Sequence, residues 1–245
     1  SSRYRPRLLF KLYPYSPVQM KRSGQLLISF YRNDLMETDH FGYSHLPTWR
    51  NTSSIREYFH DGFREALKGY DPVEELRGHL NPDFSLWHHL NQAQYLEMKL
   101  LLAGYLLSSQ GERMAMANSV EGRYPFLDHR LAEYAARISP SLKIRGLKEK
   151  HILKQAFMDR LPPEILARTK QPYGAPNKEC FFADGRPKAG VSELLTEDAL
   201  KEAGVFNPAG VARLVEKCAF SNRLGFRDNS ALVGILSTQI LTRLF

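Results

Sequence analysis

The apolar stretch in residues 91–109 is the feature that most constrains how this chain folds. Leu96, Leu100, Ala103 and Leu107 recur at helical spacing, and further apolar residues fill the positions around them. A helix that is apolar on most of its sides is usually buried. We therefore expect a helix over roughly 91–109 that runs through the core.

Helical patterns also dominate the rest of the chain from residue 53 onward, whereas strand signals are sparse. Ser53 or Ser54 is expected to cap a helix that ends at Gly69, and Pro72 suits the first turn of the next one. Asp128 is a natural N-cap for the amphipathic run that follows it. The sequence thus predicts a mostly helical chain, with further helices around 114–117, 147–160, 163–167, 192–202, 208–219 and 228–244.

The cysteines and the apolar runs indicate the cellular compartment of the protein. Cys180 and Cys218 lie far apart and outside any CxxC pattern, so neither a disulfide framework nor a zinc knuckle is expected. Such cysteine usage fits a reducing cytoplasm. The apolar run at 100–107 is far shorter than the roughly 20 residues that cross a bilayer. We expect a cytoplasmic protein with no membrane span.

The positive charge is concentrated at the start of the sequence. The net charge is +8, and residues 1–33 contain seven Lys and Arg side chains and no acid. We predict that residues 1–50 form a basic, Pro- and Tyr-rich connecting segment and that 51–245 form the helical domain. A basic arm could contact RNA through its phosphates. The prolines favour a solvated linker instead, so nucleic-acid binding is a minor alternative.

The candidate catalytic and binding residues lie mainly in the block of residues 111–130. The sequence has no phosphate-binding GxxxxGK[ST] loop, no GxGxxG, no HExxH zinc motif and no GxSxG elbow, and no metal site is expected. Ser119, Glu121, Arg123 and Asp128 fall within ten residues around a Gly and a Pro. A loop of this kind can present a carboxylate and a guanidinium to a cleft. Arg123 could equally be a structural partner of a carboxylate, and Asp128 a helix cap.

Three ordered motifs resemble those of asparagine synthetases and their relatives, which include β-lactam synthetase, carbapenam synthetase and lasso-peptide cyclases. The first, at 113–128, resembles the family pattern RMxMAxSxExRxPFLD. The second, at 146–154, resembles GxxKxxL[RK], and the third, at 161–176, resembles LPxxI followed by RxKxx[FY]xxP. The resemblance extends over about residues 50–245.

The resemblance implies a fold, a reaction and a set of site residues. The fold would be the helical C-terminal portion of an α/β synthetase domain of the PP-loop ATPase type, similar to the adenine nucleotide alpha hydrolases. ATP would activate a carboxylate, commonly that of aspartate, as an acyl-adenylate, and ammonia from glutamine would attack it. Glu121 matches the family acid that works with the incoming amine, and Lys170 matches its active-site lysine. Arg113, Lys150 and Arg168 are expected near phosphate or carboxylate groups.

The sequence departs from the family pattern in ways that affect this expectation. Glu112 stands where the family usually has Asp. The SGGxDSS pyrophosphate loop, the GEGxDE segment with its magnesium-binding acid and the glutaminase domain do not occur in the sequence. We therefore expect the main residues that bind ATP and Mg²⁺ to lie upstream, and the chain alone to be inactive. Its expected partners are an N-terminal synthetase part and a glutaminase part, with a homodimer as one further assembly.

Two alternatives remain open at this stage. The same adenylation chemistry could serve another carboxylic acid, by amidation or by cyclisation, because a few side chains decide the acceptor. A non-catalytic subunit could instead have kept the helical scaffold. The missing ATP loop favours this reading, and the retention of Glu121 and Lys170 argues against it.

Overall fold

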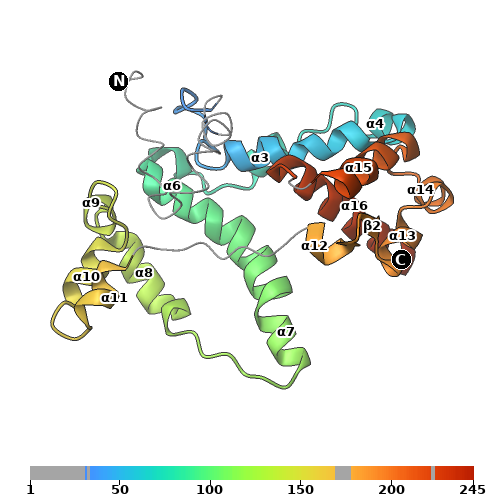
Figure 1. Cartoon of the computed structure of the whole chain (residues 1–245). Coiled ribbons are helices and arrows are strands. Elements are labelled where there is room, and N and C mark those ends of the chain that lie inside the picture. Colours follow the sequence, from blue (N-terminus) through green and yellow to red (C-terminus); the bar gives the residue numbers. More distant parts are fainter. Residues whose placement is uncertain (1–30, 32–33, 169–177, 222–223) are drawn as a thin grey trace. The chain divides into compact units, whose positions relative to one another are not determined.

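The computed structural model describes residues 31, 34–168, 178–221 and 224–245 (Figure 1). Most of these residues are helical, which confirms the prediction of a mostly helical chain. The strands in this part of the chain are β1 (Phe182–Ala183) and β2 (Arg186–Pro187), which pair antiparallel. Contacts divide the chain into two compact units: unit 1 takes 1–45 with 77–171, and unit 2 takes 46–76 with 172–245. The predicted segment boundary at residue 50 stays a prediction.

Unit 2 contains the larger hydrophobic core. Leu200, Phe206, Leu214 and Ile235 are each exposed by 2% or less and belong to one buried cluster. Figure 1 shows α15 and α16 lying together with α3 and α4. The helical elements of unit 2 are α3 (Leu46–Ser53), η1 (Ser54–Tyr58), α4 (Asp61–Ala66), α5 (Pro72–Gly78), α12 (Lys178–Phe181), α13 (Ala189–Leu194), α14 (Glu197–Ala203), α15 (Pro208–Phe220) and α16 (Phe226–Leu244).

A buried amide connects the helices of this core. Gln239 is 3% exposed, and its side-chain nitrogen donates to Leu194 O at 3.1 Å and to Ala199 O at 3.2 Å. These two carbonyls lie at the end of α13 and within α14, so one residue of α16 fixes both shorter helices. Thr196 separates α13 from α14 because its hydroxyl accepts from Ala199 N and caps α14. The single helix predicted over 192–202 is therefore two helices.

The helix predicted to start at Ser53 is also interrupted. Ser53 precedes η1 without a capping hydrogen bond from its side chain, and the hydroxyls of Ser53 and Ser54 donate to Arg50 O and Asn51 O instead, so the predicted cap is wrong for both serines. The break falls at Phe59 and His60, where the backbone is extended. His60 N donates to Val205 O at 2.9 Å, and Phe59 forms a backbone bridge with Phe206. These tertiary hydrogen bonds take the place of those that would continue the helix.

Unit 1 has few buried side chains. Phe84, at 3% exposure, packs against the rings of Trp87 and Tyr95, and Leu96 is fully buried. The helical elements of unit 1 are η2 (Phe84–Leu86), α6 (His89–Leu96), η3 (Glu97–Gln110), α7 (Glu112–Ala117), η4 (Pro125–Leu127), α8 (His129–Arg137), α9 (Pro140–Lys143), α10 (His151–Ala156) and α11 (Pro163–Ala167).

The apolar helix over 91–109 exists, but Leu96 is its one buried residue, contrary to the sequence prediction of a core helix. It consists of α6 followed by η3, whose hydrogen bonds have π spacing, and Figure 1 shows them as one long rod leading to α7. No residue of η3 is buried, and Leu101 and Tyr105 are 42% and 49% exposed. The π spacing joins residues five apart, so side chains at α-helical intervals no longer share one face.

Candidate functional site

The block of residues 111–130 identified in the sequence forms α7, a loop with the short helix η4, and the start of α8. α7 ends at Ala117, where Ser119 N donates to Met116 O at 3.1 Å and Val120 N donates to Ala115 O at 2.9 Å. Ser119 has φ 58°, a left-handed conformation that a non-glycine residue seldom adopts. This turn directs the chain away from α7 into the open loop that carries Glu121.

Glu121 and Arg123 form an ion pair within this loop. Arg123 Nε lies 3.0 Å from Glu121 Oε1, and the two side chains are 83% and 68% exposed. Gly122 between them is packed against Tyr124, and a Cβ at Gly122 would collide with the Tyr124 ring. An exposed pair of this kind contributes little to stability. It keeps a carboxylate and a guanidinium together on an accessible loop.

Asp128 ends the block, and the structure confirms its predicted role as a helix cap. Its Oδ1 accepts from Arg130 N at 2.9 Å, and its Oδ2 accepts from the Arg130 guanidinium at 2.9 Å. These hydrogen bonds from Arg130 hold the pKa of the Asp128 carboxyl below its usual value. Both carboxylate oxygens of Asp128 are therefore occupied by hydrogen bonds at the start of α8.

The basic residues of the candidate site lie on other elements of unit 1. Arg113 is exposed on α7, and Lys150 precedes α10 with a left-handed backbone, φ 55°. Arg168 follows α11, and Lys154 Nζ on α10 donates to Arg168 O at 3.2 Å. This contact ties α10 to the end of α11. The lysine predicted to be catalytic, Lys170, lies outside the described residues.

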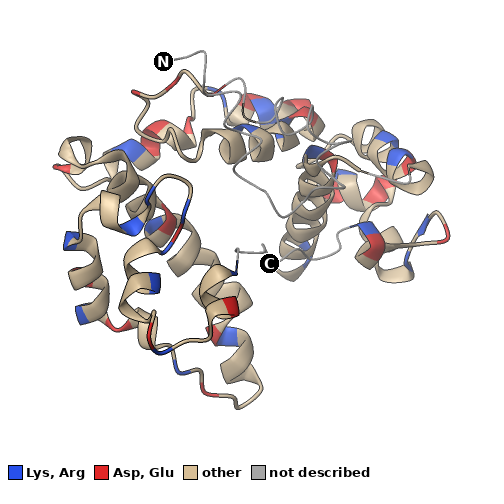
Figure 2. Ribbon diagram, turned by 60° about the vertical axis from the view of Figure 1, so that its left-hand side comes forward, with Lys and Arg blue, Asp and Glu red and all other residues tan. Residues whose placement is uncertain are grey.

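The structure brings these predicted residues together only in part. Lys150 and Arg168 are linked through α10 and its hydrogen bond to the end of α11. Among the described residues, no hydrogen bond or ion pair joins Glu121 or Arg113 to either of them. Charged residues of both signs are spread along this part of the ribbon in Figure 2. The Glu121 and Arg123 side chains are exposed, so the loop that carries them is open to solvent.

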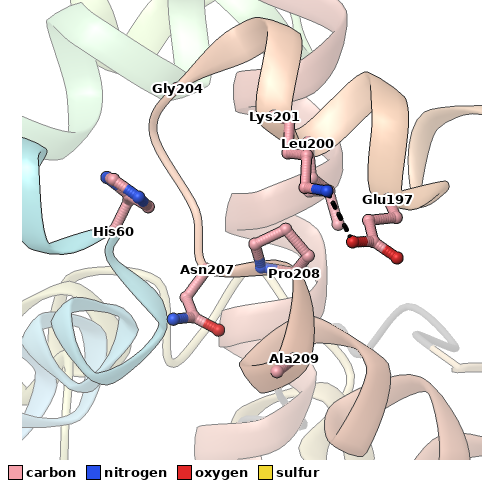
Figure 3. A pocket seen from close by; sticks show the side chains of 8 residues that line it. All are labelled: His60, Glu197, Leu200, Lys201, Gly204, Asn207, Pro208 and Ala209. Atoms are coloured by element: carbon pink, nitrogen blue, oxygen red, sulfur yellow. Dashed lines mark ion pairs between the residues drawn. The ribbon is translucent and has the colours of Figure 1, made fainter.

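Sequence reasoning did not anticipate a shallow pocket in unit 2. It has a volume of about 360 Å³ and lies where the end of α14 and the start of α15 meet His60 (Figure 3). Gly204, with φ 66°, makes the turn between these helices, and Asn207 caps α15 by accepting from Gly210 N at 3.0 Å. Lys201 on its rim pairs with Glu197 at 2.7 Å. The Asn-Pro helix start and the i, i+4 charge pair were the available sequence signals.

Neither a metal site nor a membrane segment emerges from the described residues. In this part of the chain, no three His, Cys, Asp or Glu side chains form a group suited to a metal ion. None of its helices has the length and apolar character that crossing a membrane requires.

Comparison with known proteins connects the site to a family. The sequence model of the asparagine synthase family matches residues 5–242. Amidase chyE of Penicillium rubens is 34% identical over 137 residues, which are 54% of this chain and 20% of the relative. Asparagine synthetase [glutamine-hydrolyzing] 3 of Bacillus subtilis is 34% identical over 126 residues, covering 51% and 19%. Amidase chry2 of Gibberella zeae is 35% identical over 124 residues, covering 48% and 18%.

These matches cover about a fifth of the length of each relative. No solved structure matches the chain.

Proposed function

The chain belongs to the asparagine synthase family, and on that premise we propose that it forms part of an ATP-dependent, amide-forming ligase. The proposed reaction is the synthesis of asparagine from aspartate through an acyl-adenylate, with ammonia derived from glutamine. Because the matched region is about a fifth of each relative, we expect activity to require further polypeptide. The cytoplasm is the proposed location, and two cysteines that form no disulfide fit it.

The observation that carries this proposal is the loop between α7 and α8. It holds the family block at 113–128 with the carboxylate of Glu121 exposed to solvent and paired only with a neighbour in the same loop. A carboxylate so placed is accessible to an incoming amine. The ion pair with Arg123 holds this carboxylate within the loop.

The chemistry proceeds in two steps. A carboxylate oxygen of the acid attacks the α-phosphorus of ATP, the bond to the bridging oxygen breaks, and pyrophosphate leaves. The amine nitrogen then attacks the acyl carbon, the bond to the adenylate oxygen breaks, AMP leaves, and the amine loses a proton. We assign that proton to Glu121, and we assign to Lys170 the stabilisation of negative charge at the α-phosphate in the first step.

Other basic side chains of unit 1 suit phosphate or carboxylate groups. Arg113, Lys150 and Arg168 all carry a positive charge and lie within the three family motifs. Among the described residues, no group of three His, Cys, Asp or Glu side chains suits a metal ion. We propose that the ligands of Mg²⁺ lie in the further polypeptide.

A second candidate is the same chemistry on a different acid. Two of the relatives are named amidases and not asparagine synthetases. The acceptor is therefore open to test across amino acids and other small carboxylic acids, including those that cyclise.

The test is release of pyrophosphate from ATP, measured with magnesium, ammonia and aspartate or another acid. The chain alone should release none, and the chain supplemented with the remaining polypeptide should release it in an acid-dependent way. In the active assembly, Lys170→Ala should abolish release, while Glu121→Gln should slow amide formation more than adenylation. Full turnover in both variants would show that neither residue takes part in the mechanism. If no acid supports pyrophosphate release from ATP, a non-catalytic subunit would be favoured.

A further inference from the structure

Lys154 connects the two short helices α10 and α11 (Figure 1). Its Nζ donates to Arg168 O at 3.2 Å, although the two residues are 14 positions apart in the sequence. Between them α10 ends, the carbonyl of Phe157 accepts from the amides of Arg160 and Leu161 in a tight turn, and α11 follows. The hydrogen bond from Lys154 therefore closes a loop that contains the whole of α11.

Helix α11 has little buried surface of its own. Of its five residues, Leu166 is half-buried and the others are exposed, Ile165 by 47%. A helix this short is not stable through its own hydrogen bonds. Its last carbonyls also lack the amide partners that a continuing helix would supply. The end of α11 therefore depends on contacts from outside the helix.

Arg168, at the end of α11, is held through both of its backbone polar groups. Its N–H donates to Ile165 O at 3.3 Å, and its carbonyl accepts from Lys154 Nζ. The backbone of Arg168 has φ −59° and ψ 130°, so the helix stops at this residue. An ammonium suits this place because the carbonyl end of a helix carries a partial negative charge. The contact fixes the residue at which the chain leaves α11.

The burial of Lys154 distinguishes it from an ordinary surface lysine. Lys154 is half-buried, whereas Lys148 and Lys150 in the same motif are exposed. An exposed lysine keeps its ammonium hydrated and orders little around it. A half-buried lysine whose ammonium binds a backbone oxygen is constrained at both its stem and its head. Lys154 can therefore hold Arg168 in one position.

The hydrogen bond joins two of the three family motifs. Lys154 is the last residue of the motif at 146–154, and Arg168 is the first residue of the RxK pattern in the third motif. Lys170, to which we assign charge stabilisation at the α-phosphate, follows two positions later in the sequence. Groups that act on a reacting atom have to be held within about 0.5 Å, and neighbours that do not touch the substrate supply much of that support.

We propose that Lys154 is a positioning residue for the adenylation step. Through the carbonyl of Arg168 it fixes the point at which the chain leaves α11, and thereby the start of the RxK pattern. Lys154 itself contacts neither ATP nor the acid. It acts through the backbone, so its role requires a hydrogen-bond donor of the right reach. This role deepens the proposed function and rests on it.

The first experiment digests the 245-residue chain with trypsin, which cuts after Arg168 at the carbonyl that Lys154 binds. Lys154→Met keeps an apolar stem and removes the donor, so cleavage after Arg168 should become about fivefold faster, as expected for the net loss of one hydrogen bond. Lys154→Arg keeps a donor and should stay within about twofold of the unaltered chain. The matched control Lys148→Met should leave the rate unchanged. Mass spectrometry measures this cleavage, and far-UV circular dichroism shows whether each variant keeps its helices.

The second experiment measures pyrophosphate release from ATP in the active assembly. Lys154→Met should lower kcat about tenfold or more and leave the KM for the acid within about twofold, because the substrate contacts remain. Lys154→Arg should recover most of the rate, and Lys148→Met should match the unaltered assembly. A lysine needed only for stability would lower the amount of folded protein and not kcat per folded molecule.

Three results would overturn the proposal. They are equal tryptic cleavage after Arg168 in Lys154→Met and the unaltered chain, an unchanged kcat in Lys154→Met, and an equal loss of kcat in Lys148→Met. If the unaltered assembly releases no pyrophosphate with any acid, the proposed reaction fails, and the role of Lys154 in adenylation fails with it. The digestion still decides in that case whether Lys154 anchors Arg168, so the two failures are distinguishable.

Discussion

The Glu121 carboxylate and the Arg123 guanidinium face each other at 3.0 Å across one glycine, in the loop that joins α7 to α8. Both side chains are mostly exposed, so their mutual attraction is screened by water. The pair therefore organises the loop locally without contributing much to the stability of the unit. The pair holds the Glu121 carboxylate in place on the exposed loop.

We expect Arg123→Gln to leave stability unchanged and to alter function. An exposed ion pair contributes little, so urea unfolding of the variant should match that of the unaltered chain. In an active assembly, the same variant should slow amide formation because Glu121 loses the partner that orients it. A large loss of stability would mean that Arg123 makes a structural contact in the complete protein.

Gly122→Ala should distort the same loop through a steric clash. The added Cβ would collide with the ring of Tyr124, so either the backbone or the ring must move. The tyrosine ring resonances in an NMR spectrum should shift. The double variant with Tyr124→Ala should restore the loop because it removes the obstacle; failure to restore it would show that the glycine is needed for its backbone conformation.

The core of unit 2 should respond strongly to a cavity. Leu214 is 2% exposed, and Leu214→Ala should lower the free energy of unfolding by about 2–5 kcal/mol. Leu244, 71% exposed, offers a matched control, and Leu244→Ala should change it by less than about 0.5 kcal/mol. Chemical unfolding of both variants measures the difference. Equal effects would mean that the leucine on α16 is covered in solution.

The two cysteines should differ in reactivity toward a disulfide reagent. Burial raises the pKa of the Cys218 thiol to about 11, and its side chain is fully inaccessible, whereas Cys180 is exposed. At pH 8, Cys180 should react in the folded chain and Cys218 only after unfolding. Mass spectrometry of each labelled peptide separates the two sites. Rapid labelling of Cys218 would show that unit 2 opens readily.

The cap of α8 should titrate at acidic pH. Hydrogen bonds from Arg130 lower the pKa of Asp128, so its folded pKa lies below its unfolded value of 3.8. The stabilisation is present above the unfolded pKa and is lost as the pH falls through the folded pKa. Asp128→Asn should keep a capping oxygen but remove this pH dependence. The measurement is helix content against pH from 6 to about 2, and identical curves would contradict the assignment.

Sequence signals succeeded where they act over a few residues. Asp128 begins α8, the helix predicted at 163–167 is α11, and the Asn-Pro start of α15 falls within a residue of the prediction. Side-chain caps and proline geometry depend on atoms within about four residues of each other. The order of the three family motifs is likewise a property of the sequence, and the family match bears it out.

The local sequence pattern did not predict correctly which residues are buried. The apolar pattern at 91–109 predicted a core helix, yet η3 has no buried residue. The break at Phe59 depended on Phe206, almost 150 residues further on. Likewise, the sequence named the basic residues, but the hydrogen bond from Lys154 to Arg168 O required the fold.

The sequence by itself thus determined the helical character, the helix starts at Asp128 and Pro163, and the family. Only the tertiary structure decided that the core lies around Leu214 and Ile235 in unit 2, and that Leu131 and Tyr134 on α8 are exposed. Helix formation is a local matter of backbone geometry and caps, whereas burial depends on which distant surface packs against each face.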